Sequence, residues 1–147
     1  MTEPIGLYNF GVNYLDVARA AATENREWRF NDPFEFLISH GLELIFKADA
    51  SRELGLNEIK TLYGHSLPKL FENLSDEFRR QFDVSDELKK LVDDLDIGHS
   101  GPEWRNRYLV TGLRPVFPVL SEMIQIVEPF NLNDRRWLSN HFVRQVV

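Results

Sequence analysis

The stretch "PFEFLISHGLELIFKADA", residues 33–50, decides the fold. Pro33 suits the first turn of a helix, and the segment that follows is apolar on most sides, which is typical of a largely buried helix. His40, Glu43 and Lys47 nevertheless lie inside it, at spacings of three and four residues that place them on one narrow face. The segment therefore predicts a central helix that carries a polar stripe.

Three interpretations of this stripe are open. Buried charge is costly unless it is paired and hydrogen-bonded. The stripe can face solvent with a simple Glu43–Lys47 pair, or form a structural network between helices or subunits. It can also line a ligand-binding or catalytic site, because ionisable groups in a cleft often serve function.

Helical signals continue on both sides of this segment. Apolar residues recur at spacings of three and four, with Ser, Asn or Asp at helix starts and Gly or Pro at helix ends. The third helix is expected to begin near residue 66, with Leu67, Leu70, Phe71, Leu74 and Phe78 on one face. The expected helices cover 7–24, 33–54, 66 onward, 85–98, 116–128 and 133 to near the C-terminus, with a short helical turn at 56–64. The sequence thus predicts one all-α domain over residues 1–147, and "YLVTGL" is its only strand candidate.

Composition excludes several classes of protein. No apolar run reaches the roughly 18–20 residues of a membrane span, and the N-terminus lacks the pattern of a signal peptide. The chain contains no cysteine, which excludes disulfides and thiolate chemistry. We therefore expect a cytoplasmic protein that does not interact with membranes.

Charge is distributed unevenly along the chain. The net charge is −6, but residues 103–147 hold six Arg, four acids and no Lys. An acidic protein is a poor candidate for non-specific binding along a nucleic acid. Arg is suited to bidentate phosphate contacts, so the sequence leaves room for one local Arg-lined site beside the plainer interpretation of surface ion pairs.

Two stretches, "PFEFLISHGLELIFKADA" and "GHSLPKLFENL", resemble the HEPN superfamily of all-α domains, and "RNRYL" at 105–109 is similar to an Arg-Tyr segment that often follows in such chains. The resemblance implies a bundle of about four to six helices with short connections. It also implies a homodimer with a site at the subunit junction. Members of this superfamily include metal-independent ribonucleases of toxin–antitoxin and phage-defence systems, nucleotide-binding proteins and non-catalytic partners.

The resemblance also points to Arg136 and His141 as a catalytic pair, because the nuclease signature is Arg, four to six residues, then His. RNA cleavage by the 2′-hydroxyl needs proton transfer near neutral pH and a cation beside the phosphorane, roles that suit His and Arg. The pair departs from the pattern at Trp137, where a polar residue is common. Residues five apart also lie about 140° apart on a helix, so the two do not share a face, although a site across a dimer could use one residue from each subunit. The alternative interpretation is an ordinary basic C-terminal helix.

Three further residues are candidates for binding. His65 follows a glycine at a helix start, where it can cap or pack locally, or pair with Glu43. In one interpretation Tyr108 is an anchor in the core and Arg107 forms an ion pair. In the other, Arg107 binds a phosphate and Tyr108 stacks on a base. No phosphate loop, dinucleotide fingerprint or zinc motif is present, and we predict no metal and no cofactor.

These observations leave three functional hypotheses. The first is a non-catalytic, dimeric HEPN-like protein that binds a nucleotide, an RNA or a protein partner. The second is a metal-independent endoribonuclease of a toxin–antitoxin or phage-defence system. The third is a purely structural interaction module. We rank the first slightly above the second, and whether the chain is an enzyme is left open.

Overall fold

The computed structural model describes residues 3–24, 32–99 and 119–133. All regular structure in these ranges is helical, and no strand occurs in them, which confirms the predicted all-α class. In chain order the helices are α1 (Pro4–Ala22), α2 (Asp32–Ala50), α3 (Leu56–Tyr63), α4 (Leu67–Glu72), α5 (Asp76–Gln81), α6 (Asp86–His99) and α7 (Leu120–Ile126). None of these helices is long and apolar enough to cross a membrane.

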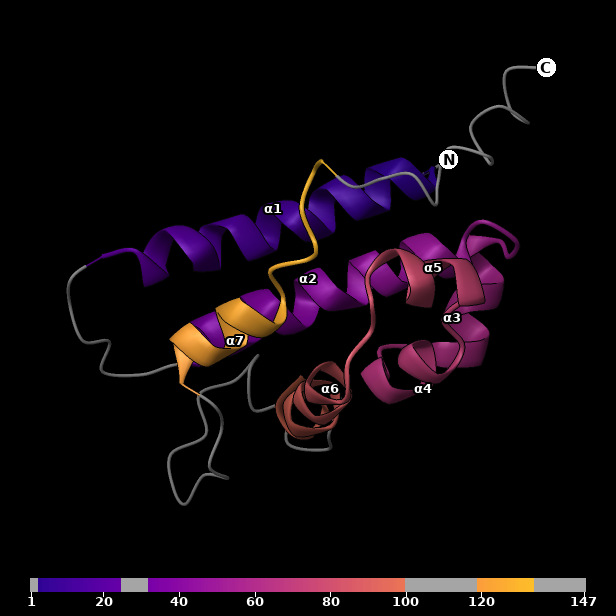
Figure 1. The fold of residues 1–147 in the computed structure, drawn as a ribbon. Coiled ribbons are helices and arrows are strands. Elements are labelled where there is room, and N and C mark those ends of the chain that lie inside the picture. Colours follow the sequence, from indigo (N-terminus) through magenta and orange to yellow (C-terminus); the bar gives the residue numbers. More distant parts are fainter. Residues whose placement is uncertain (1–2, 25–31, 100–118, 134–147) are drawn as a thin grey trace.

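The two longest helices, α1 and α2, form an antiparallel pair (Figure 1). They meet at two glycines. A Cβ atom built on Gly11 would lie 2.7 Å from the carbonyl oxygen of Gly41, and one built on Gly41 would lie 2.9 Å from that of Gly11. Real Cβ atoms essentially never lie this close to another atom, so the two backbones can approach to this distance only because both residues are glycine.

Helix α2 occupies the centre of the bundle. It packs on α1 along one side and on α4 and α6 along another, while α7 contacts α1 and α6 (Figure 1). Fully buried apolar side chains from α2 fill the space between these helices. They include Ile38, Leu42, Ile45, Phe46 and Ala48. The central buried helix predicted from residues 33–50 is therefore present.

A cluster of aromatic rings joins the distant parts of the chain. Phe78 and Phe82 lie 4.6 Å apart between ring centroids, and Phe82 lies 5.0 Å from Phe130. Phe46 contacts Phe78 edge-on at 6.1 Å. Buried aromatic pairs of this kind contribute about 0.5–1.5 kcal/mol each beyond their buried area. The cluster therefore ties α2, α5 and the segment after α7 into one core.

Side chains of α1 fix the segment that follows α7. The guanidinium of Arg19 donates to the carbonyl oxygens of Val127 and Phe130, at 2.9 and 2.5 Å. The hydroxyl of Tyr8 donates to the carbonyl oxygen of Asn131 at 2.6 Å. A helix leaves its last carbonyls without intrahelical partners. Arg19 supplies such a partner to Val127, the C-cap residue of α7, and the bonds to Phe130 and Asn131 dock the segment beyond the helix onto α1.

Helix boundaries differ from the sequence expectation at one important place. The expected third helix is interrupted and forms α4 and α5, and α3 occupies the expected helical turn at 56–64, so the described ranges hold seven helices. The break lies before Ser75, whose hydroxyl accepts a hydrogen bond from the backbone N–H of Phe78 and caps α5. Leu74 and Phe78, predicted to share one buried face, are both buried across the break.

Other helix ends differ from the expected ranges as well, and those of α2 and α6 are two examples. Helix α2 ends at Ala50, and turns occupy the four residues that were expected to continue it. Helix α6 continues through Gly98 to His99, although Gly98 was expected to end it. Gly64 does end a helix, as expected, and its φ of +55° is a conformation that favours glycine.

The close approach of α1 and α2 predicts a strong effect of one added methyl group. Replacement of Gly11 by Ala should lower the free energy of unfolding by about 1–3 kcal/mol, because the helices must move apart. Gly55→Ala is the matched control, since its Cβ would meet its nearest neighbour at 3.6 Å. Urea denaturation followed by circular dichroism measures both variants, and equal stabilities of the two would contradict the packing described here.

Candidate functional site

The polar stripe of α2 is built around a buried carboxylate. The side chain of Glu43 is 1% exposed, and its Oε1 atom accepts a hydrogen bond of 2.7 Å from Lys47 Nζ. The Nδ1 atom of His65 lies 2.7 Å from the same oxygen. His40 Nδ1 lies 3.7 Å from Oε2. Four of the predicted site residues therefore meet at one place, which we call the Glu43 cluster.

Local structure explains how His65 reaches Glu43. Helix α3 ends at Gly64, whose positive φ turns the chain, and Ser66 begins α4 by accepting a hydrogen bond from the N–H of Lys69. His65 lies between these two signals and points back to α2. Of the two roles considered for His65, the structure places it as a partner of Glu43, 22 residues away in sequence.

Exposure differs sharply within the cluster. The side chain of His65 is 50% exposed, whereas those of His40 and Lys47 are partly exposed and that of Glu43 is buried. The carboxylate thus lies beneath a rim of two imidazoles and one ammonium group. A buried carboxylate with two close donors avoids most of the cost of an isolated buried charge. The rim remains accessible to a ligand.

Two aromatic rings extend this rim. The ring of Tyr14, from α1, meets that of His40 edge-on at 4.7 Å, and the ring of Phe36 stacks on His40 at 5.8 Å. Sequence analysis did not single out either residue. The sequence could have indicated Phe36, because this residue precedes His40 by one helical turn. It could not have indicated Tyr14, because only the packing of α1 on α2 brings it to His40.

A second buried carboxylate on α2 was also missed. Asp49 accepts hydrogen bonds of 2.7 Å from both the N–H and the hydroxyl of Ser75, and of 3.2 Å from Arg52. Arg52 also pairs with Glu77. These contacts fix the start of α5 against α2. We interpret this group as structural, because its partners are supplied by the fold.

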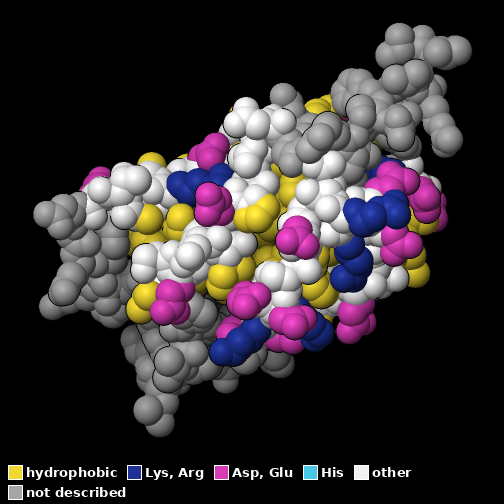
Figure 2. All heavy atoms as spheres, in the orientation of Figure 1, with side chains coloured by type: hydrophobic (Ala, Val, Ile, Leu, Met, Phe, Trp, Pro, Cys, Tyr) yellow, Lys and Arg dark blue, Asp and Glu magenta, His cyan; other side chains and the backbone are white. Residues whose placement is uncertain are grey.

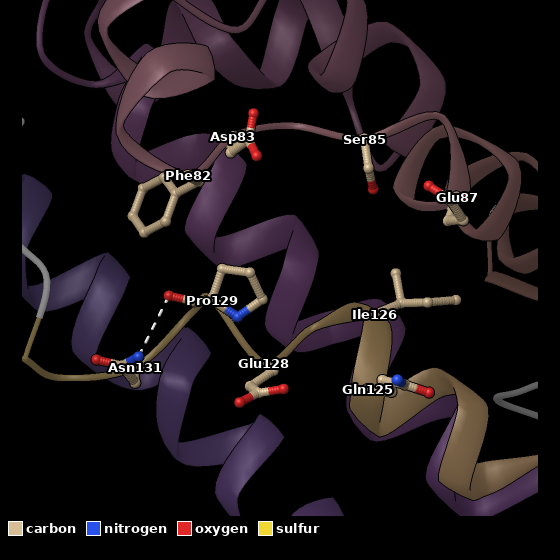
Figure 3. Close-up of a pocket in the computed structure, with 9 residues that line it drawn as sticks. All are labelled: Phe82, Asp83, Ser85, Glu87, Gln125, Ile126, Glu128, Pro129 and Asn131. Carbon is tan, nitrogen blue, oxygen red and sulfur yellow. Dashed lines mark hydrogen bonds between the residues drawn. The ribbon is translucent and has the colours of Figure 1, made fainter.

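A hollow lies elsewhere in the described part of the chain, between the α5–α6 connection and the end of α7 (Figure 3). Its volume is about 670 Å³, and Phe82, Ile126 and Pro129 contribute apolar surface to it. Its charged lining residues are all acidic: Asp83, Glu87 and Glu128. A phosphate would be repelled here, and none of the predicted site residues lines this hollow.

Four predicted site residues lie outside the described ranges. They are Arg107, Tyr108, Arg136 and His141, and the strand candidate "YLVTGL" lies there too. The described ranges contain no group of three or more His, Asp or Glu side chains suited to a metal ion. Of the predicted site residues, only those of the Glu43 cluster lie within the described ranges.

Comparisons with known proteins give no family. No protein-family model, no curated protein and no solved structure matches the chain. The resemblance to the HEPN superfamily therefore stays a prediction.

Because Glu43 is buried, its replacement should lower the free energy of unfolding more than replacement of a carboxylate in an exposed ion pair. Glu43→Gln should lower the free energy of unfolding by about 1–3 kcal/mol, because a neutral amide replaces the carboxylate beneath Lys47 and His65. Asp93→Asn is the matched control, since Asp93 pairs with Lys89 at the same four-residue spacing on the surface and should cost less than about 0.5 kcal/mol. Denaturant titration of both variants measures the difference, and a neutral Glu43→Gln would refute the network.

Proposed function

We propose that this chain is a HEPN-like helical protein that acts as a homodimer and binds a phosphate-bearing ligand, a nucleotide or an RNA. The binding surface is the rim of the Glu43 cluster, formed by His40, Lys47 and His65. The observation that carries this proposal is the arrangement of three nitrogen-bearing side chains, each at least partly exposed, around one buried carboxylate.

The chemistry of the rim suits a phosphate. Imidazole and ammonium groups donate hydrogen bonds to phosphate oxygens, and donors held in place by a buried carboxylate lose less entropy on binding. The neighbouring rings of Tyr14 and Phe36 suit a base, since unstacked nucleobases bind on aromatic side chains. Groups that can donate hydrogen bonds to a phosphate thus lie beside aromatic rings that can stack on a base.

Surface charge favours a local contact over broad coating of nucleic acid. In Figure 2 basic and acidic side chains are interspersed on the face shown, and no large basic patch covers it. With a net charge of −6, the protein as a whole repels polyanions. A single nucleotide, or a short unpaired stretch of RNA, therefore fits better than a long duplex.

Binding can be tested directly. Purified protein in EDTA is titrated with ATP by calorimetry and with fluorescein-labelled single-stranded RNA by anisotropy. We expect saturable micromolar binding of at least one probe, and a loss of about 10-fold or more in His65→Ala, since a hydrogen bond to a charged group is worth about 1.5–3 kcal/mol. Lys89→Met, on the surface of α6, is the control and should bind like wild type.

The other outcomes decide among the alternatives. If neither probe saturates at about 1 mM, the binding proposal is wrong, and a structural role for the Glu43 cluster is favoured. RNA cleavage in EDTA that survives His40→Ala but disappears in His141→Ala would instead establish the ribonuclease alternative.

A further inference from the structure

His65 is the most exposed member of the Glu43 cluster, and a buried group fixes its orientation. Its side chain is 50% exposed, and its Nδ1 atom lies 2.7 Å from the Oε1 atom of Glu43. A carboxylate only accepts hydrogen bonds, so the proton of the neutral ring lies on Nδ1 and the lone pair lies on Nε2. Glu43 thus determines both the direction of the ring and which of its nitrogens is the nucleophile.

The second histidine of the cluster differs in both respects. The Nδ1 atom of His40 lies 3.7 Å from the Oε2 atom of Glu43, which is longer than a hydrogen bond. Its ring contacts those of Tyr14 and Phe36, and its side chain is only 27% exposed. His40 therefore belongs to the wall of the site, whereas His65 presents an oriented imidazole to solvent.

The charges beside His65 suit the transfer of a phosphoryl group to its ring. Lys47 Nζ lies 2.7 Å from the same carboxylate oxygen as His65 Nδ1, so an ammonium group is close to the ring. This cation can interact with the oxygens of a phosphoryl group. The ring itself gains positive charge when Nε2 forms a bond to phosphorus, and the carboxylate of Glu43 stabilises that charge through the Nδ1 proton.

We propose that His65 is a phosphoryl acceptor, whose Nε2 atom takes a phosphoryl group from a small phosphoanhydride or phosphoramide and becomes phosphohistidine. The lone pair of Nε2 attacks phosphorus, and the bond from nitrogen to phosphorus forms. The bond from phosphorus to the leaving group breaks, and its electron pair departs with the leaving group. Nδ1 keeps its proton, in the hydrogen bond to Glu43, which acts as a positioning residue.

This inference rests on the proposed function, because the donor is a phosphate-bearing ligand of the same rim, and it adds a covalent step to that function. The step also explains why the site would combine an exposed imidazole with a carboxylate that is 1% exposed. Reversible binding of a phosphate needs only donors of hydrogen bonds. A nucleophilic imidazole needs in addition a fixed tautomer, and the buried carboxylate supplies it.

Phosphoramidate, a small donor of this class, tests the step. In its zwitterionic form the nitrogen is already protonated, so ammonia leaves with the electron pair and no further proton is required. The folded full chain is incubated with this donor in EDTA, and mass spectrometry of the intact protein counts the phosphoryl groups. We expect one group per chain, which fragmentation places on His65 and which mild acid removes.

Variants separate a reactive His65 from general labelling of histidine. His65→Asn should gain no phosphoryl group under conditions that fully label the wild type. His99→Asn is the matched control, since it removes another of the four histidines, and should be labelled like the wild type. The wild type unfolded in urea is a second control, in which all four histidines should react slowly and at similar rates.

The role of Glu43 has its own measurements. Glu43→Gln should be labelled about 10-fold more slowly or less, because a hydrogen bond to a charged group is worth about this factor in rate. Circular dichroism verifies that the variant is folded. Phosphorus NMR of the wild type should show the Nε2 isomer of phosphohistidine, a result that does not depend on any variant.

Several results would overturn the inference. They are an absence of labelling, equal labelling of several histidines in the folded chain, a phosphoryl group on Nδ1, and a Glu43→Gln variant that reacts like the wild type. Failure of the proposed function is a different result, because the ATP and RNA titrations measure reversible binding. A covalent label can form where neither probe saturates, and either probe can saturate where no label forms.

Discussion

The contact between Gly11 and Gly41 is the constraint on which the rest of the structure depends. Because neither residue has a side chain, the backbones of α1 and α2 touch, and the side chains around the crossing interlock at short range. That approach sets where Tyr14 lies relative to His40, and where Arg19 and Tyr8 meet the segment after α7. A wider crossing would separate Tyr14 from His40, the pair that spans the two helices.

Two of the buried carboxylates of helix α2 fix the positions of helices α3 to α5. Glu43 holds the α3–α4 connection by way of His65, and Asp49 holds the start of α5 by way of Ser75. The helices they fix, α3 to α5, are short and would be marginal alone, since isolated helices of fewer than about 12 residues are rarely stable in water. Buried polar groups therefore determine the position of elements that have little intrinsic stability.

Much of this arrangement could be read from local patterns, and some could not. The periodicity of residues 33–50 and the spacing of His40, Glu43 and Lys47 were sufficient to predict a buried helix with a polar stripe. The pairing of His65 with Glu43 was one of two open roles, because a residue in a connection can point in several directions. The break at Ser75 depends on Asp49, 26 residues earlier. The spacing of apolar residues along a helix gives no information about such a long-range contact.

The electrostatics of the molecule limit how the Glu43 cluster can work. The net charge of −6 and the acidic hollow beside α7 repel phosphate, so long-range attraction cannot raise the rate of association. Within the cluster, Glu43 already balances the charge of Lys47. For the proposed anionic ligand, affinity would then come from hydrogen bonds of the imidazoles and from contact with the rings of Tyr14 and Phe36. Under the proposed function, these interactions would favour a small ligand with both a phosphate and a base, and they would depend little on salt because they act at contact distance.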